Sequence, residues 1–268
     1  MADEKECRQF DINSANPTEG NLYPSNYVST AKYTLLTLVP KNLFEQFHRV
    51  ANIWFLVVSF FQVLPLELSP TSSWATIAPL SLVLTVTMLK DAYLDYKRHQ
   101  SDKEINNREV LIWKAEATQF QKWSQLQVGN IVVLKENQPV PADLVLLTTS
   151  HQEKICYIET SNLDGESNLK IKSSLPDTAE LFEGSLEECL EMLHKLDQAV
   201  LKSEHPNNRL YTYEGTLKLK GHPRSTPIEN SNLLLRGSTL KNTNWAVGVV
   251  VFTGVGTKLM MNSKAAPH

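Results

Sequence analysis

One long apolar stretch dominates the hydrophobic pattern of the chain. Between Val50 and Leu89 the sole formal charge is Glu67, which divides the stretch in two. Each piece is long enough to cross a bilayer as a helix, which takes about 20 mostly apolar residues. A carboxylate at mid-membrane would cost roughly 3 kcal/mol, so Glu67 is expected in the turn between the helices. The pattern predicts a transmembrane helical hairpin with spans at about residues 50–66 and 72–92.

The alternative for this stretch is a buried helical hairpin in a soluble core, because prolines interrupt both pieces at Pro65, Pro70 and Pro79. Membrane helices tolerate proline better than soluble helices do. Positive residues flank the stretch on both sides, at Lys41, Arg49, Lys90, Lys97 and Arg98. The loop from Glu67 to Ser73 has no Lys or Arg. Both ends of the chain are therefore expected on the cytosolic side.

The pattern is polar on either side of the hairpin. Met1–Asn21 is expected to form a flexible tail that can fold back on the cytosolic domain. Asp91–Arg108 is charged and compatible with a helix, so the second span is expected to continue as a stalk. This gives a cytosolic N-terminal segment at 1–40, the hairpin with its stalk at 41–98 and a cytosolic domain at 99–268.

Beyond Glu109 the pattern changes to short β segments separated by Gly, Pro and Asn. They are Val110–Trp113, Ile131–Leu134, Leu144–Thr148, Leu210–Leu219, Leu233–Leu235 and Val247–Thr253. This spacing favours a small sandwich or jelly roll over a parallel α/β sheet. Apolar residues at helical spacing predict one inserted helix, at Leu186, Leu190, Leu193, Leu196 and Val200. The helix is expected to pack on the sandwich, with contact to a partner protein as the alternative. The expected fold is thus an α+β membrane protein, a transmembrane hairpin plus a mostly-β, distorted jelly-roll domain.

Composition changes this picture little. A hydrophobic content of 42% and a net charge of −3 would suit a plain soluble protein, but the average hides the apolar stretch. The N-terminus is charged and lacks an apolar core, so no cleavable signal peptide is expected. Cys7, Cys156 and Cys189 are odd in number and far apart, which fits a reducing cytosol.

The polar run from Ile158 to Lys170 places a glycine turn between two strand-like stretches. Its centre reads Asp164-Gly165-Glu166-Ser167. Gly165 permits a turn with positive φ, and Asp164 can brace that turn with its own hydrogen bonds. Glu166 is then expected to point outward. Such a tetrapeptide is by itself typical of an ordinary surface hairpin, so its meaning depends on the rest of the chain.

The run resembles the dephosphorylation loop of P-type ATPases, in the D-G-E-T-N-L-K form of the phospholipid-translocating (P4) branch, the lipid flippases. Ser167 stands where that branch usually has Thr. Five further stretches fit the same branch in the same order: Lys41–Arg49, Lys90–Tyr93, Ser101–Arg108, Pro141–Asp143 and Leu234–Gly237. The resemblance covers about Tyr33 to about Asn262.

The resemblance implies that residues 99–268 form the actuator domain of an ATP-dependent flippase, which moves phospholipid toward the cytosolic leaflet. Such ATPases run through an aspartyl phosphate, whose hydrolysis needs a carboxylate to position and polarise water. The resemblance gives that role to Glu166, with Asp164, Gly165 and Ser167 holding the loop. A solvated turn carboxylate is the alternative for Glu166. Pro141–Asp143 is assigned a structural role, as a turn at the start of a strand.

Two polar residues of the first span are candidates for substrate contact. Gln62 lies near the outer end of the span, where burying an unpaired amide is unfavourable. The resemblance implies a part in selecting the lipid headgroup, and hydrogen bonding between helices is the alternative. Asn52, near the cytosolic end, is the second candidate, and interfacial hydrogen bonding explains it more simply.

No cofactor or metal site is expected in this chain. Gly254–Lys258 lacks the first glycine of a phosphate loop, and its Thr and Lys are in reversed order. No cluster of His, Cys or carboxylates has metal-ligand spacing. The resemblance implies ATP and Mg²⁺ for the full-length enzyme, bound by domains absent here. It also implies phospholipid, a membrane and a two-span accessory subunit as partners, and no nucleic acid.

A P-type ATPase carries its phosphorylated aspartate in a D-K-T-G-T stretch, which this sequence lacks. The chain alone is therefore expected to be inactive, as the front third or less of a flippase. One alternative is a truncated, non-enzymatic membrane protein that binds the accessory subunit. Another is a fragment of a cation-transporting P-type ATPase, although the residues around Asp164 and at Phe44–Arg49 favour lipid. A multi-pass location in Golgi, endosomal or plasma membrane is expected.

Overall fold

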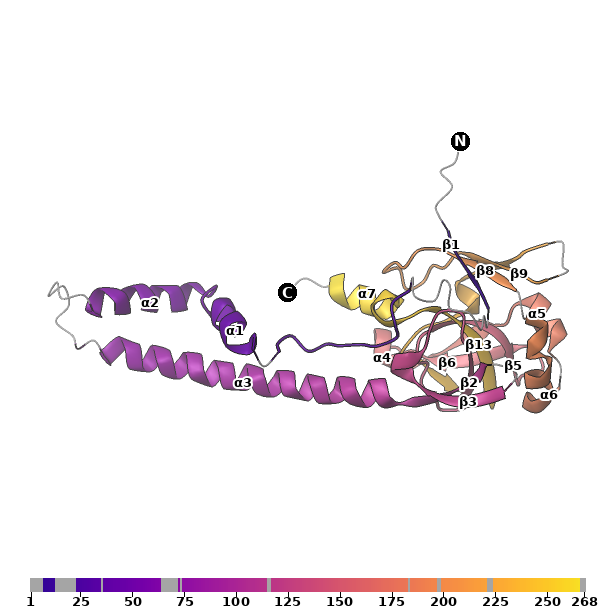
Figure 1. The fold of residues 1–268 in the computed structure, drawn as a ribbon, viewed down its shortest axis with the longest axis horizontal. Coiled ribbons are helices and arrows are strands. Elements are labelled where there is room, and N and C mark those ends of the chain that lie inside the picture. Colours follow the sequence, from indigo (N-terminus) through magenta and orange to yellow (C-terminus); the bar gives the residue numbers. More distant parts are fainter. Residues whose placement is uncertain are drawn as a thin grey trace, which may run out of the picture. The chain divides into compact units, whose positions relative to one another are not determined.

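The computed structural model describes residues 7–12, 23–34, 36–63, 72, 74–114, 117–182, 184–196, 199–220 and 224–265 (Figure 1). The chain divides into two compact units. Ser29–Ile105 forms one of them, called here the helical unit. Met1–Val28 and Asn106–His268 together form the other, called here the β unit. Each unit is described by itself.

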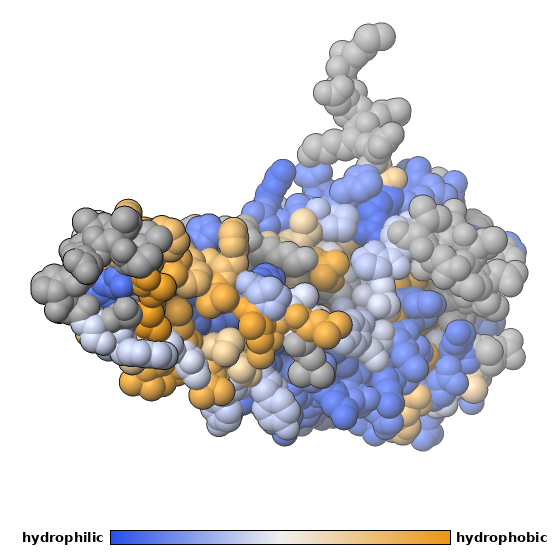
Figure 2. Space-filling view, turned by 60° about the vertical axis from the view of Figure 1, so that its left-hand side comes forward, coloured by the Kyte–Doolittle hydropathy of each residue, from blue (hydrophilic) through white to orange (hydrophobic). Residues whose placement is uncertain are grey.

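The helical unit contains α1 (Leu38–Gln46), α2 (Val50–Val63) and most of α3 (Trp74–Asn107). Among the described residues, α3 alone is long and apolar enough to cross a membrane, and none of its most apolar window is buried. The helix continues through Pro79 and through the charged segment after Asp91, so the predicted helical continuation is present, while its place as a cytosolic stalk stays a prediction. Figure 2 shows apolar side chains gathered on the surface of the helices, and such a surface needs lipid or protein to cover it.

The first predicted span is only partly described. α2 is apolar but has 14 residues, fewer than a spanning helix needs. The end of that span and the turn with Glu67 fall in residues 64–71, which lie outside the described residues. The second span is therefore matched by a long apolar helix, and the two-span hairpin stays a prediction.

Carboxylates on one face of α3 hold the segment that precedes α1. Asp102 accepts hydrogen bonds from the Thr30 amide (2.7 Å) and hydroxyl (2.8 Å). Asp95 accepts from the Lys32 amide at 2.6 Å, and Asp91 accepts from the Asn42 side chain of α1 at 2.8 Å. Residues four and seven apart share a helix face, so α3 presents all three acceptors to α1 and to the segment before it.

The β unit is built from three sheets whose strands pair antiparallel. The strand orders are β11-β5-β13-β4-β2-β3, β1-β8-β9-β10 and β12-β6-β7. The strands are β1 (Arg8–Asp11), β2 (Glu109–Lys114), β3 (Ala117–Lys122), β4 (Ile131–Lys135), β5 (Asp143–Thr149), β6 (Ile155–Glu159), β7 (Leu169–Ser173), β8 (Val200–Ser203), β9 (Gly215–Lys218), β10 (Thr226–Ile228), β11 (Leu233–Leu234), β12 (Thr239–Lys241) and β13 (Trp245–Phe252). The helices are α4 (Ser161–Asp164), α5 (Pro176–Leu181), α6 (Leu186–Met192) and α7 (Lys258–Ala265), with 3₁₀ turns at Trp123–Gln125, Leu193–Leu196, Asn230–Asn232 and Gly254–Gly256.

The main core cluster lies on one face of the six-stranded sheet. Every residue of β5 is buried, and so is all of β13 after Trp245. Alternate residues of these strands, such as Val145, Leu147 and Val249, contribute to one cluster, as the period-2 geometry of a strand requires. Leu201 of β8 and Leu217 of β9 bring the four-stranded sheet into the same cluster. A mostly-β domain is confirmed.

The inserted helix is shorter than predicted. Ser185 caps α6 by accepting from the Glu188 amide, but the α-helix ends at Met192 and Val200 already belongs to β8. Leu193 and Leu196 are fully buried in the core cluster, so the predicted packing on the sheets is confirmed. The strand prediction for Leu210–Leu219 was wrong in its first half, because only Gly215–Lys218 pairs.

The prediction of a flexible tail is wrong for residues 8–12. β1 pairs with β8, and Phe10 and Ile12 are buried in the core cluster. The two apolar residues alternate with polar ones, which is the pattern of a half-buried edge strand. The remainder of Met1–Asn21 lies outside the described residues, apart from Cys7.

A buried polar network joins distant parts of the β unit. Asp143 accepts from the Arg236 amide and from the Lys258 amide, each at 2.8 Å, and burial raises its pKa to about 6. The Arg236 guanidinium donates to the Asn26 side chain at 2.9 Å. Asn26 also accepts from the Gly254 amide and donates to the carbonyls of Trp123 and Pro141. All four hydrogen-bonding positions of this buried amide are thus used.

Replacing Asn26 by Ala should lower the free energy of unfolding of the β unit by about 3 kcal/mol, because several buried donors and acceptors lose their partner at once. Near-ultraviolet circular dichroism of the buried Trp113 and Trp123, followed through guanidinium unfolding, measures the change. Ser25→Ala is the matched control, since Ser25 is exposed, and should stay within about 0.5 kcal/mol of wild type. Equal stability of the two variants would contradict the structural role of Asn26.

Candidate functional site

The loop between β6 and β7 carries the acidic residues singled out by the sequence. The two strands pair antiparallel up to Glu159 opposite Leu169, and α4 forms one helical turn between them. Gly165 ends α4 with a φ of 76°. A Cβ at Gly165 would meet nothing within 4 Å, so glycine is needed for its backbone conformation and not for space.

Asp164 lies at the centre of the loop's hydrogen bonds. Its carboxylate accepts from the Thr160 hydroxyl (3.0 Å), the Glu166 amide (3.0 Å), the Lys170 ammonium (2.5 Å) and the Tyr211 hydroxyl (3.3 Å). The hydrogen bond from Lys170, followed by that from the Glu166 amide, lowers the pKa of Asp164 to about 2. Asp164 is therefore ionised throughout the physiological pH range and fixes the turn.

Glu166 points outward from this turn. Its side chain is 60% exposed, and its carboxylate lies 3.2 Å from the Lys170 ammonium. Ser167 is also exposed. Leu169, Ile171 and Tyr211 add large exposed apolar side chains on β7 and on the segment before β9. An exposed carboxylate beside apolar residues can act on a group presented by another domain that covers this surface.

The turn at Gly237 packs against α4, the helical turn of this loop. This glycine has a φ of 85°, and a Cβ here would lie 3.3 Å from Leu163 of α4 and 3.4 Å from Leu259 of α7. The preceding residue, Arg236, belongs to the buried polar network. The Leu234–Gly237 stretch therefore links that network to the underside of α4.

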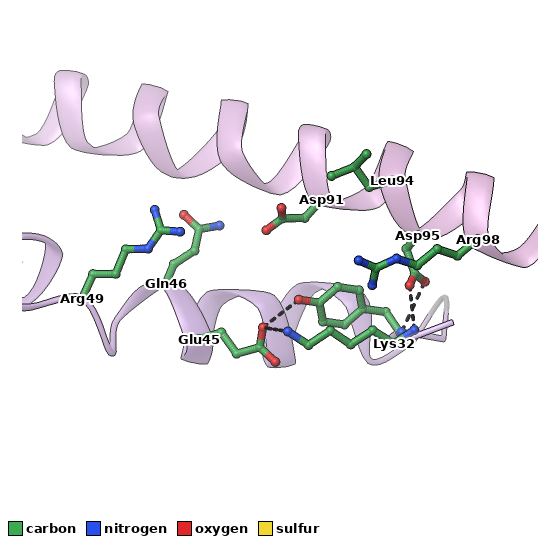
Figure 3. Close-up of a pocket in the computed structure, with 9 residues that line it drawn as sticks. Lys32, Glu45, Gln46, Arg49, Asp91, Leu94, Asp95 and Arg98 are labelled. Carbon is green, nitrogen blue, oxygen red and sulfur yellow. Dashed lines mark hydrogen bonds and ion pairs between the residues drawn. The ribbon is translucent and has the colours of Figure 1, made fainter. Parts of the chain in front are cut away.

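A pocket of about 240 Å³ in the helical unit is a second candidate site (Figure 3). It is lined by Lys32, Tyr33, Glu45, Gln46, Arg49, Asp91, Leu94, Asp95 and Arg98. Charges of both signs face the same space, with Asp91, Asp95 and Arg98 on α3. Gln46 is 3% exposed, and its Oε1 has no hydrogen-bond partner in the described part of the chain. The pocket is thus lined by charges of both signs, with a buried acceptor in its wall.

The two substrate candidates of α2, Asn52 and Gln62, differ in their contact with this pocket lining. The Asn52 side chain donates to the Gln46 carbonyl at 2.8 Å, which joins the start of α2 to the end of α1. Gln62 is half-buried in the last turn of α2. Neither residue is among those that line the pocket.

Sequence reasoning missed Lys170 and Tyr211, the side chains that contact the carboxylates of the loop. Lys170 lies four residues further along the same motif, so its contact with the turn could have been proposed from the spacing. Tyr211 could not, since it is 47 residues from Asp164 in sequence. The pocket in the helical unit was also missed, because its residues come from three separate segments.

The described residues contain no group of three or more His, Cys, Asp or Glu side chains suited to a metal ion. In the loop, both oxygens of Asp164 already accept from N–H and O–H donors. The Lys258 ammonium, at the end of the glycine-rich stretch, is fully buried 2.9 Å from Glu204 and 2.9 Å from Asn207. Lys258 therefore stabilises the fold through buried contacts.

Two family models match the chain. The phospholipid-translocating ATPase N-terminal model matches residues 10–77, and the P-type ATPase actuator domain model matches residues 104–261. The second match contains the loop with Glu166 and all strands from β2 to β13.

Curated relatives agree with these matches. The probable phospholipid-transporting ATPase 12 of Arabidopsis thaliana is 44% identical over 97% of this chain and 21% of its own length. The human phospholipid-transporting ATPase ID is also 44% identical, over 97% of the chain and 21% of its own length. The Saccharomyces cerevisiae phospholipid-transporting ATPase DRS2 is 41% identical over 98% and 19%. The chain spans about a fifth of the length of these relatives.

Replacing Gly165 by Ala should loosen the loop, because an L-residue in the left-handed region costs roughly 1–2 kcal/mol. Hydrogen exchange of the amides of residues 160–170 is expected to become about tenfold faster. Gly256→Ala is the control, since a Cβ there makes only an ordinary contact, 3.6 Å from Pro206. Unchanged exchange in Gly165→Ala would show that the turn does not depend on its glycine.

Proposed function

Because this chain belongs to the phospholipid-translocating P-type ATPases, we propose that it is the N-terminal part of a flippase that moves phospholipid toward the cytosolic leaflet. Its β unit would act as the actuator domain, and Glu166 would promote hydrolysis of the aspartyl-phosphate intermediate. The observation that carries the proposal is the Glu166 side chain, 60% exposed on a turn that Asp164 holds in place.

Glu166 would act as a general base. Its carboxylate would accept a hydrogen bond from a water molecule and take the proton as the water oxygen attacks phosphorus. The bond from phosphorus to the aspartyl oxygen then breaks, which returns a free carboxylate and releases phosphate. A positioned base typically contributes roughly 10²–10⁴-fold to such a step. The phosphorylated aspartate belongs to a domain outside this chain, as do the sites for ATP and Mg²⁺.

Asp164, Gly165 and Ser167 would hold the loop and not react. The carboxylate of Asp164 is occupied by hydrogen-bond donors, and Gly165 supplies the backbone conformation of the turn. The apolar residues around the loop, Leu169, Ile171 and Tyr211, support docking of another domain on this face.

The helical unit would provide the first two spans of the transporter, with both chain ends in the cytosol. The length and apolar surface of α3 support one span, and the bias of Lys and Arg on the flanks supports the orientation. A two-span accessory subunit is the proposed partner, and Golgi, endosomal or plasma membrane the proposed location. A truncated, non-enzymatic isoform that binds the accessory subunit remains the second candidate.

The mixed-charge pocket supports contact with a zwitterionic headgroup in this unit. Arg49 and Arg98 can face a phosphate, while Asp91 and Asp95 can face an ammonium group. Gln62 and Asn52 stay proposed headgroup contacts in α2. The identities of the relatives favour lipid over cation as cargo.

In a full-length ATPase whose N-terminal region is this chain, Glu166→Gln should leave phosphorylation intact and slow phosphoenzyme decay by about 10²-fold or more. Radiolabelled phosphoprotein, measured after an ATP pulse and chase, gives the decay rate. Glu153→Gln is the matched control, because Glu153 is another exposed carboxylate of the β unit. Decay of Glu166→Gln at the wild-type rate would remove Glu166 from the reaction.

The topology can be tested by labelling Ser72→Cys in a Cys7→Ser background, in which the remaining Cys156 and Cys189 are buried. In sealed vesicles, a membrane-impermeant maleimide should reach position 72 only from the non-cytosolic side. Ser101→Cys, an exposed site near the end of α3, should react only from the cytosolic side. Labelling of both positions from the same side would rule out a span between them.

A further inference from the structure

The ammonium group of Lys170 joins the two carboxylates of the loop. Its Nζ lies 2.5 Å from Asp164 Oδ2 and 3.2 Å from Glu166 Oε2. The three groups differ in exposure: the side chain of Asp164 is 14% exposed, that of Lys170 28% and that of Glu166 60%. The cation therefore sits between a nearly covered carboxylate and an outward one.

Asp164 fixes the place of the ammonium. Its carboxylate is held by the Thr160 hydroxyl and the Glu166 amide as well as by Lys170. Tyr211, from the segment before β9, contacts both Asp164 and Lys170. Its hydroxyl donates to Asp164, and its ring centroid lies 5.3 Å from Lys170 Nζ. A lysine held on two sides loses much of the freedom that its long side chain normally has.

Glu166 is the most exposed member of the trio. An ion pair to so exposed a glutamate contributes little to stability, at most about 1 kcal/mol. Its effect is on orientation, because a fixed ammonium 3.2 Å away limits the directions that the carboxylate takes. Charge matters as well: the two carboxylates carry two negative charges, and Lys170 offsets one of them. A phosphorylated aspartate is itself an anion, so removing Lys170 would increase its repulsion from the loop.

We propose that Lys170 is a positioning residue for Glu166, which it orients and electrostatically balances for attack of water on the aspartyl phosphate. The inference rests on the proposed role of Glu166. Lys170 acts through Glu166 and does not itself touch the phosphoryl group. Asp164 and Tyr211 are the anchor that holds the ammonium in place.

Phosphoenzyme decay in the full-length ATPase described above tests this role. Lys170→Met removes the charge at similar length and should slow decay about tenfold, within the range of coupling between residues in contact. Lys170→Arg keeps the charge and should restore decay to within about threefold of wild type. Lys241→Met is the matched control, since Lys241 is a partly exposed lysine paired with Glu159 at 3.6 Å, and should decay like wild type.

The deciding measurement is the double variant. In a Glu166→Gln background, Lys170→Met should change the decay rate by less than about twofold, because its effect passes through the carboxylate that is already lost. A full tenfold loss in that background would overturn the proposal, since Lys170 would then act on the phosphoryl group or on the fold. Wild-type decay in the single variant Lys170→Met would also overturn it.

If Glu166 has no role in dephosphorylation, the phosphoenzyme of Glu166→Gln would decay at the wild-type rate whatever residue stands at position 170. That result distinguishes failure of the proposed function from failure of the Lys170 proposal. If Lys170→Met yields no phosphoenzyme, Lys170→Gln serves as the second variant, since it keeps a hydrogen-bond donor without the charge. It should slow decay by a similar factor, and decay at the wild-type rate would overturn the proposal.

Discussion

The β unit depends on satisfying a few buried polar groups that come from distant parts of the sequence. Asp143 accepts backbone amides from Arg236 and from the first residue of α7, and Asn26 receives the Arg236 guanidinium. Leaving any of these groups unpaired in the interior would cost roughly 1–3 kcal/mol. The network therefore requires that the N-terminal segment, β5, the Gly237 turn and the start of α7 come together in one arrangement.

Side-chain packing connects this buried network to the candidate site. Gly237 follows Arg236 directly and lies against Leu163 of α4, which precedes Asp164. The turn is thus supported by the core on one side and closed by Tyr211 on the other. Glu166 is more exposed than Asp164 or Lys170. A fixed turn with one exposed carboxylate suits a domain that must act on a group held by another domain.

In the helical unit, carboxylates on the surface of a helix likewise accept hydrogen bonds from other segments of the chain. Asp91, Asp95 and Asp102 of α3 accept hydrogen bonds from α1 and from the segment before it. The Asn42–Asp91 contact joins two of the motif stretches, Lys41–Arg49 and Lys90–Tyr93, and Asp102 of Ser101–Arg108 binds Thr30. The apolar surface of α2 and α3 is left for lipid or for further helices, since the described residues do not cover it.

The sequence by itself determined the elements with strong local patterns. The apolar length of α3, the continuous hydrophobic runs of β5 and β13 and the positive-φ turn at Gly165 follow from period, burial and backbone freedom, all of which are local properties. Tertiary contacts were needed to establish that residues 8–11 form an edge strand, that Val200 leaves the helix, and that Tyr211 reaches Asp164. Those outcomes depend on contacts between residues far apart in the chain, and a side chain such as Tyr211 carries no local sign of the partner that folding brings to it.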